Sequence, residues 1–96
     1  MFYYCKNLID FNADLSSLVT GDDMFYNCNN LKSFTTNNLN SLVAADSMFS
    51  GCSSLTSFNS DLNSLVNGSG MFSSCSSLTS CTSDLSSLVD GGGMFY

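Results

Sequence analysis

The sequence predicts a mainly β repeat protein, a short β-solenoid of about four 23-residue coils. A Met-Phe-x-x-Cys-x-x-Leu motif recurs at residues 1–8, 24–31, 48–55 and 71–78. Apolar residues return at the same places in each copy, and mostly Ser, Asn, Thr, Gly and Asp lie between them. Glu, Gln and Arg are absent and Ala occurs only three times, so strong helix formers other than Leu are scarce. Recurrence at this period is typical of coils that cover each other's apolar faces.

The 96 residues form one repeat array that is divided by its own motif. The repeats are 1–23, 24–47, 48–70 and 71–93, with a partial repeat at 94–96. Repeat arrays usually carry polar terminal caps, whereas the first copy here is as apolar as the others. We therefore expect residues 1–96 to be a fragment of a longer array. The alternative is that open ends meet other copies of the chain.

The second repeat is one residue longer than the other three. Its additional residue falls between Phe34 and Leu39, a polar stretch that separates two apolar positions. We expect this insertion to bulge from a turn rather than to enter the core.

Each coil is expected to contain a turn, a short strand, a second extended piece and a loop. Phe2, Cys5, Leu8 and Phe11 are spaced by three, which predicts a 3₁₀ turn at Met-Phe-x-x-Cys. The Leu-x-x-Phe segment that follows predicts a short strand, and Asp-Leu-x-Ser-Leu-Val predicts the second extended piece. The polar residues before the next Met are expected to form a loop that faces water.

The recurring apolar side chains are the expected core. The predicted core residues are Phe2, Cys5, Leu8, Phe25, Cys28, Leu31, Phe49, Cys52, Leu55, Phe72, Cys75 and Leu78.

The repeat resembles the BspA-like leucine-rich repeats of bacterial surface proteins. The resemblance lies in Leu-x-x-Phe, a Leu-x-x-Leu stretch and Met-Phe-x-x-Cys-x-x-Leu, and it covers the whole chain. It implies a leucine-rich-repeat fold, an extracellular or cell-surface location and a role in adhesion. The chain departs from the family pattern in having no Pro, and no signal peptide pattern precedes the first repeat.

The charge of the chain excludes two classes of partner. The formal net charge is −6, and Lys6 and Lys32 are the only cations. Nucleic acid binding requires many phosphate-neutralising Lys or Arg, and anionic membranes attract basic segments. No apolar run approaches the length of a membrane span. We expect neither nucleic acid binding nor membrane insertion.

The cysteines are interpreted as small buried apolar residues. Cys5, Cys28, Cys52 and Cys75 form one column and Cys81 stands in a Phe column. Stacked thiols can bind soft metals or pair as disulfides, but an odd count without Cys-x-x-Cys spacing is no disulfide framework. No metal or other cofactor is expected.

The aspartates are interpreted as turn residues. Asp14, Asp61 and Asp84 share a column that Asn interrupts in the second repeat. Such carboxylates can hold Ca²⁺ or serve a glycosidase, but Asp also caps its own backbone in turns. Since the chain contains no His, a Ser-His-Asp triad is ruled out, and no catalytic residue is expected.

The tyrosines leave two interpretations open. Tyr3, Tyr4, Tyr26 and Tyr96 follow the Phe column, where the middle repeats have Ser. They can stack on sugar or protein partners, or pack at the edge of the corner turn.

The predicted function is a non-enzymatic repeat scaffold that binds protein or glycan, in surface adhesion. The outward residues beside the first strand are the expected binding surface, namely Thr56, Ser57, Asn59, Thr79, Ser80 and Thr82. One alternative is a structural subunit that self-associates through its open ends into a filament. A polysaccharide-acting enzyme is the distant alternative.

Overall fold

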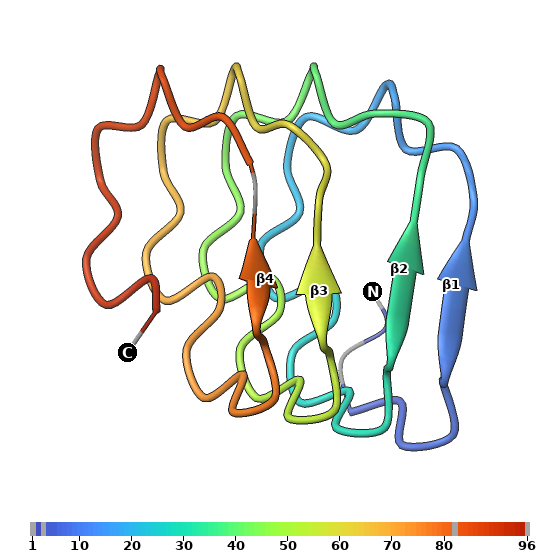
Figure 1. Ribbon diagram of the computed structural model, residues 1–96. Helices are drawn as coiled ribbons and strands as arrows, with labels where there is room; N and C mark the ends of the chain where they lie inside the picture. Colours follow the sequence, from blue (N-terminus) through green and yellow to red (C-terminus); the bar gives the residue numbers. More distant parts are fainter. Residues whose placement is uncertain (1, 3, 82, 96) are drawn as a thin grey trace.

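The computed structural model describes residues 2, 4–81 and 83–95. Its strands are β1 (Asp10–Asn12), β2 (Ser33–Thr35), β3 (Ser57–Phe58) and β4 (Ser80–Cys81). No helix occurs among these described residues. Figure 1 shows the chain winding four times, with one strand in each winding and all four strands pointing the same way. The expected mainly β repeat with one short strand at each Leu-x-x-Phe is confirmed, and the fourth strand lies at the equivalent Leu78-Thr79-Ser80-Cys81.

Neighbouring windings are joined by parallel pairing in two places. β1 pairs with β2, with Phe11 opposite Phe34, and β3 pairs with β4, with Phe58 opposite Cys81. A second line of single parallel bridges joins Thr20 to Ala44, Ala44 to Asn67 and Asn67 to Asp90. Each partner lies one repeat further along the chain, so the sequence period is also the period of the backbone hydrogen bonds.

The Met-Phe-x-x-Cys segment consists of successive turns, and the prediction of 3₁₀ geometry there was wrong. The Cys28 N–H donates to the Phe25 carbonyl at 3.1 Å, and Cys52 bonds Phe49 in the same way at 3.0 Å. The expected bond to the third preceding residue therefore forms. The residue before each Cys has a positive φ, as at Asn27 and Gly51. A positive φ at the third of four positions marks a type II turn and prevents a 3₁₀ helix from continuing.

The second extended piece was also predicted wrongly. The Leu42 N–H donates to the Leu39 carbonyl at 3.1 Å, and Leu65 bonds Leu62 at 3.1 Å. The Asp-Leu-x-Ser-Leu segment is thus another turn. Side chains three residues apart would point to opposite faces of an extended strand, so both Leu side chains point inward only because the chain turns between them. The extended residues come later, at the bridges that include Ala44 and Asn67.

The interior is built around two columns of stacked phenylalanines. In the first column, Phe49 stacks on Phe25 at 5.3 Å and on Phe72 at 5.7 Å between ring centroids, with the rings nearly parallel. In the second column Phe34 stacks on Phe58. Rings of the two columns meet edge to face, as Phe49 and Phe34 do at 4.9 Å. Such pairs contribute about 0.5–1.5 kcal/mol each beyond the area they bury.

The predicted core residues divide by winding. Seven are fully or almost fully buried, namely Phe25, Cys28, Leu31, Phe49, Cys52, Leu55 and Phe72. Five are only partly buried and pack against the others, namely Phe2, Cys5, Leu8, Cys75 and Leu78. These five lie in the first and fourth windings, where a neighbouring winding covers one side only. The remaining buried apolar residues are Met24, Leu39, Leu42, Ala45, Met48, Phe58, Leu62, Leu65, Met71 and Met94.

Candidate binding groove

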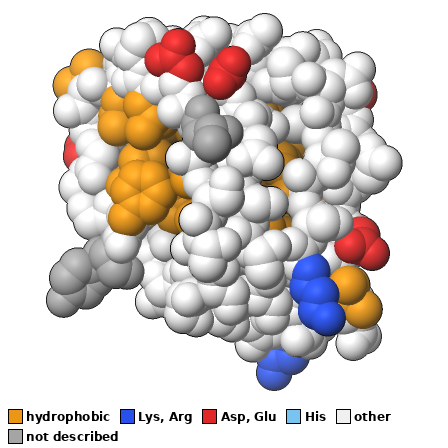
Figure 2. All heavy atoms as spheres, in the orientation of Figure 1, with side chains coloured by type: hydrophobic (Ala, Val, Ile, Leu, Met, Phe, Trp, Pro, Cys, Tyr) orange, Lys and Arg blue, Asp and Glu red, His pale blue; other side chains and the backbone are white. Residues whose placement is uncertain are grey.

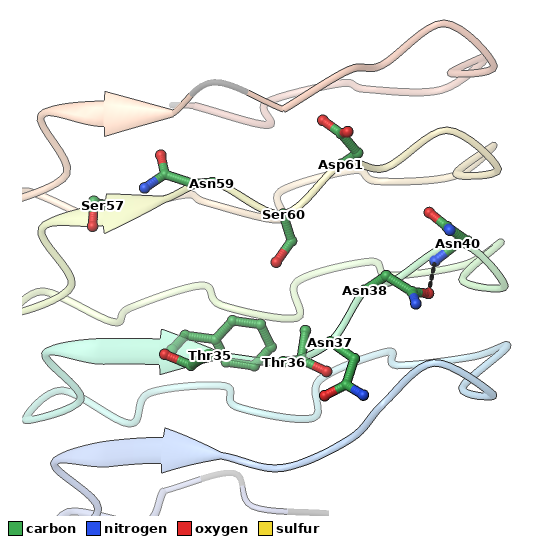
Figure 3. A pocket seen from close by; sticks show the side chains of 10 residues that line it. Thr35, Thr36, Asn37, Asn38, Asn40, Ser57, Asn59, Ser60 and Asp61 are labelled. Atoms are coloured by element: carbon green, nitrogen blue, oxygen red, sulfur yellow. Dashed lines mark hydrogen bonds between the residues drawn. The ribbon is translucent and has the colours of Figure 1, made fainter.

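A polar groove lies between the second and third windings, just beyond the ends of β2 and β3 (Figure 3). Its volume is about 500 Å³. The residues that line it are Phe34, Thr35, Thr36, Asn37, Asn38, Asn40, Ser57, Asn59, Ser60 and Asp61.

The groove lies where the second repeat has its additional residue. Asn37 is exposed, Asn38 is half-buried and Leu39 is fully buried, so the chain bulges outward before it returns to the core. The prediction that the insertion stays outside the core is confirmed. β2 and β3 belong to separate two-stranded sheets, which makes this boundary different from the two flanking ones.

Both walls of the groove are held by bonds that run away from it. On one wall, the Thr36 hydroxyl accepts a bond from the Leu15 N–H of the first winding at 2.8 Å. On the other wall, the Ser60 carbonyl accepts a bond from the Ser83 hydroxyl of the fourth winding at 2.6 Å. Each wall is thus bonded to the winding on its far side.

The groove offers hydroxyl, amide and carboxylate groups. The Asn38 side-chain oxygen accepts a bond from the Asn40 N–H at 3.0 Å, which fixes the orientation of one amide (Figure 3). Asp61 is the one acidic residue of the lining, and the lining contains no basic residue. The two lysines of the chain gather at one corner of the molecule, in blue in Figure 2. The chemistry suits a neutral ligand that has many hydrogen-bonding groups.

The predicted binding surface overlaps with the groove in part. Ser57 and Asn59 line it, although Ser57 is half-buried. Thr56, Thr79 and Ser80 are exposed but lie outside the lining. Thr82 falls outside the described residues.

Sequence reasoning missed most of the groove. The residues it did not propose as binding residues are Phe34, Thr35, Thr36, Asn37, Asn38, Asn40, Ser60 and Asp61. The signal in the sequence that could have located the groove was the additional residue of the second repeat. An outward bulge at this residue separates the ends of β2 and β3.

Two aspartates of the predicted column cap turns. The Asp14 carboxylate accepts the Ser16 N–H at 2.9 Å, and Asp84 accepts the Ser86 N–H at 3.0 Å. Hydrogen bonds from Ser16 lower the pKa of Asp14. Among the described residues no group of three potential metal ligands comes together. Asp14 and Asp84 thus have the local backbone role that Asp takes in turns, whereas Asp61 accepts a longer bond of 3.4 Å from the Asp84 N–H of the next winding.

The cysteine thiols tie each winding to the one before it. The Cys28 thiol donates to the Phe2 carbonyl at 2.9 Å, Cys52 to Phe25 at 3.2 Å and Cys75 to Phe49 at 3.1 Å. All three are free thiols. Burial raises the pKa of Cys52 well above its ordinary value and raises that of Cys75 to about 11. Thiols with such pKa values stay protonated and remain poor nucleophiles and poor metal ligands.

A second hollow, of about 480 Å³, is lined by Tyr4, Asp23, Tyr26 and Ser47. The two tyrosine rings meet edge to face, with centroids 5.6 Å apart and planes at 82°. Tyr4 has a φ of 61°, a left-handed conformation that costs about 1–2 kcal/mol for a residue with a Cβ. Packing of the two tyrosine rings stabilises the fold by about 0.5–1.5 kcal/mol, which is similar in size to this cost.

One short parallel strand per winding, an apolar interior shared between windings and polar surface hollows define a repeat scaffold protein. The chain belongs to the BspA-type leucine-rich repeat family. Residues 1–93 match the family model described as "BspA type Leucine rich repeat region (6 copies)". The description refers to six copies, whereas the chain makes four full windings over these residues.

The other comparisons add no relative. No curated protein and no solved structure matches the chain. Among the described residues, no helix has the length and apolar character needed to cross a membrane.

Proposed function

We propose that this chain is a non-enzymatic, solenoid-like scaffold that binds a glycan or protein ligand at the cell surface or outside the cell. Two observations support the proposal. The family suggests a repeat scaffold, often one associated with a surface. The groove between the second and third windings supplies a hollow of ligand size, lined almost entirely by hydroxyl and amide groups. The groove is the observation on which the proposal depends.

A neutral glycan is the ligand class that this lining fits best. Thr and Ser hydroxyls and Asn amides can each donate and accept hydrogen bonds, as sugar hydroxyls do. Anionic sugars are disfavoured because the groove contains Asp61 and no basic residue. A protein ligand would have to present an uncharged or basic polar segment for the same reason.

Binding without catalysis is the simpler use of this groove. Glycoside hydrolysis ordinarily uses two carboxyl groups placed on either side of the scissile bond. Asp61 is the one carboxylate in the lining. The groove can therefore position a sugar, but its lining supplies one of the two groups that hydrolysis needs.

A glycan array with matched variants tests the proposal. We expect the chain to bind neutral oligosaccharides, and the double variant Asn37→Ala/Asn40→Ala to lose most of that binding. Thr79→Ala/Ser80→Ala is the matched control, since both residues are exposed and outside the groove. If the control variant loses binding equally, the groove is not the site. If the folded chain binds no glycan and no surface protein, the proposal fails.

Deletion of Asn37 tests the groove by its architecture. The deletion returns the second repeat to 23 residues, so β2 and β3 should pair as the flanking strands do. We expect the groove to close, ligand binding to disappear and the melting temperature to be kept or raised. Retention of full binding by a folded deletion variant would contradict the role of the groove.

A further inference from the structure

The hollow formed by Tyr4, Tyr26, Asp23 and Ser47 is separate from the polar groove and differs from it in chemistry. Two of its four lining residues are aromatic and one is a carboxylate. Two rings that meet at 82° leave an internal corner that both ring faces border. A flat sugar ring stacks on a single face, whereas a compact rounded group can contact both faces of a corner.

Tyr4 is an unusual choice for its position. The equivalent residues of the later windings are Asn27, Gly51 and Ser74, which also have positive φ and are small. Tyr4 carries a large ring into the same backbone conformation, is 56% exposed and is held by a 2.7 Å bond from its N–H to the Tyr26 carbonyl. The ring is thus displayed toward solvent where the repeat pattern calls for a small residue.

The electrostatics of the hollow favour a cation. The faces of tyrosine rings carry the negative part of the ring quadrupole, and cations bind over them. The Asp23 carboxylate adds a full negative charge, and neither lysine of the chain lines the hollow. The net charge of −6 adds a field of the same sign.

We propose that this hollow binds a quaternary ammonium group, with the cation in the corner between the Tyr4 and Tyr26 rings and beside the Asp23 carboxylate. Quaternary ammonium groups have a delocalised charge and an apolar surface, which makes them suited to aromatic faces. The group can come from free choline or from a trimethylated lysine of a protein partner. Both sources present the same chemistry to the hollow.

Titration by NMR with choline tests the proposal at constant ionic strength, which is kept with NaCl. Two ring contacts and one exposed ion pair predict a dissociation constant of roughly 10 mM. We expect upfield shifts of the choline methyl protons and shifts of the Tyr4 and Tyr26 ring resonances. The neutral isostere 3,3-dimethylbutanol should bind at least about fivefold more weakly because it lacks the charge.

Variants distinguish binding of choline in the hollow from non-specific attraction of the cation by the net negative charge of the chain. Tyr4→Asn installs the residue found at the equivalent Asn27 and should weaken choline binding about two- to fivefold without loss of folding. Tyr26→Ser, which installs the residue found at Ser50, is the second test of a lost ring. Asp23→Asn should also weaken binding, whereas Asp84→Asn, at an exposed position that lines neither hollow, changes the net charge equally and should leave binding unchanged.

Several outcomes would overturn the proposal. They are equal binding of choline and its neutral isostere, equal effects of Asp23→Asn and Asp84→Asn, or unchanged affinity in both tyrosine variants. Absence of any shift at tens of millimolar choline is another. A trimethyllysine peptide compared with its unmethylated form then distinguishes the two sources of the group.

Discussion

At the scale of single residues, the backbone position before each Cys helps to set the path of the corner turns. Tyr4, Asn27, Gly51 and Ser74 all have positive φ at this position. Gly51 is the residue best suited to it, because glycine meets no Cβ penalty there. It is also the most constrained, since a Cβ at this position would overlap with the side-chain oxygen of Asn27 in the preceding winding.

Gly51→Ala is therefore expected to destabilise the protein by about 1–2 kcal/mol, the cost of a left-handed L-residue. Urea unfolding measures the change. Gly92→Ala is the control, because a Cβ there comes no closer than 3.4 Å to Asp90 and its φ is not in the left-handed range. The control should stay within about 0.5 kcal/mol of the parent chain. Equal losses in both variants would contradict the role of φ.

The thiol of Cys75 makes stability depend on pH in the alkaline range. Burial raises the pKa of Cys75 from 9.0 to about 11, so folding favours the protonated thiol. As the pH rises, the unfolded chain releases this proton before the folded chain does. The contribution of the Cys75 thiol to stability is therefore full below pH 9.0 and is lost as the pH rises to about 11. Urea unfolding of the parent and of Cys75→Ala at several pH values isolates the effect, because Tyr and Lys titrate in both chains. Parallel pH profiles of the two chains would refute it.

At the scale of elements, the phenylalanine columns hold neighbouring windings together, a role that long paired strands have in larger sheets. The strands are only two or three residues long, so few hydrogen bonds are available in each. Phe49 contacts four other rings, those of Phe25, Phe34, Phe58 and Phe72. The columns therefore carry the contact between windings through the middle of the molecule, including the boundary where β2 and β3 do not pair.

Phe49→Ala is expected to cost about 3–5 kcal/mol, the usual loss for a fully buried phenylalanine. Phe95→Ala is the matched control, because Phe95 belongs to the same column, stacks only on Phe72 among the described residues and is 57% exposed. Its removal should cost well under half as much. Thermal and urea unfolding measure both variants, and similar losses would mean that the column is not the main contact between windings.

At the scale of the whole molecule, charge opposes compactness. The chain carries a net charge of −6 with two lysines, and its Cα radius of gyration is only 11.7 Å. Self-repulsion of this kind destabilises compact states. Exposed charges are also screened by salt, since the Debye length falls from about 30 Å at 0.01 M to about 3 Å at 1 M.

Raising NaCl through this range should therefore raise the melting temperature. Asn63→Lys/Ser87→Lys adds two cations at exposed positions and should show a smaller response to salt, together with a higher melting temperature at low salt. Circular dichroism melts of both chains check this. A salt response that is unchanged in the lysine variant would point to a cause other than net charge.

Much of the fold could be predicted because the same pattern of apolar and polar residues recurs in every repeat. The recurrence of Phe34, Phe58 and their equivalents predicted the strands, and the parallel register follows the repeat length. The turns were harder, because spacing by three is shared by 3₁₀ geometry and by successive type II turns. The sign of φ at Asn27 and Gly51 distinguishes the two, and spacing does not contain it.

The sequence alone determined the period, the residues that pack inward and the family. The reason is that equivalent apolar residues recur in every repeat, and each winding covers its neighbour by stacking these residues on one another. Tertiary structure decided which polar residues gather into sites. The groove exists because one additional residue separates two strand ends that come from different windings. The rings of Tyr4 and Tyr26 occupy different columns of the aligned repeats and meet only because adjacent windings bring them together.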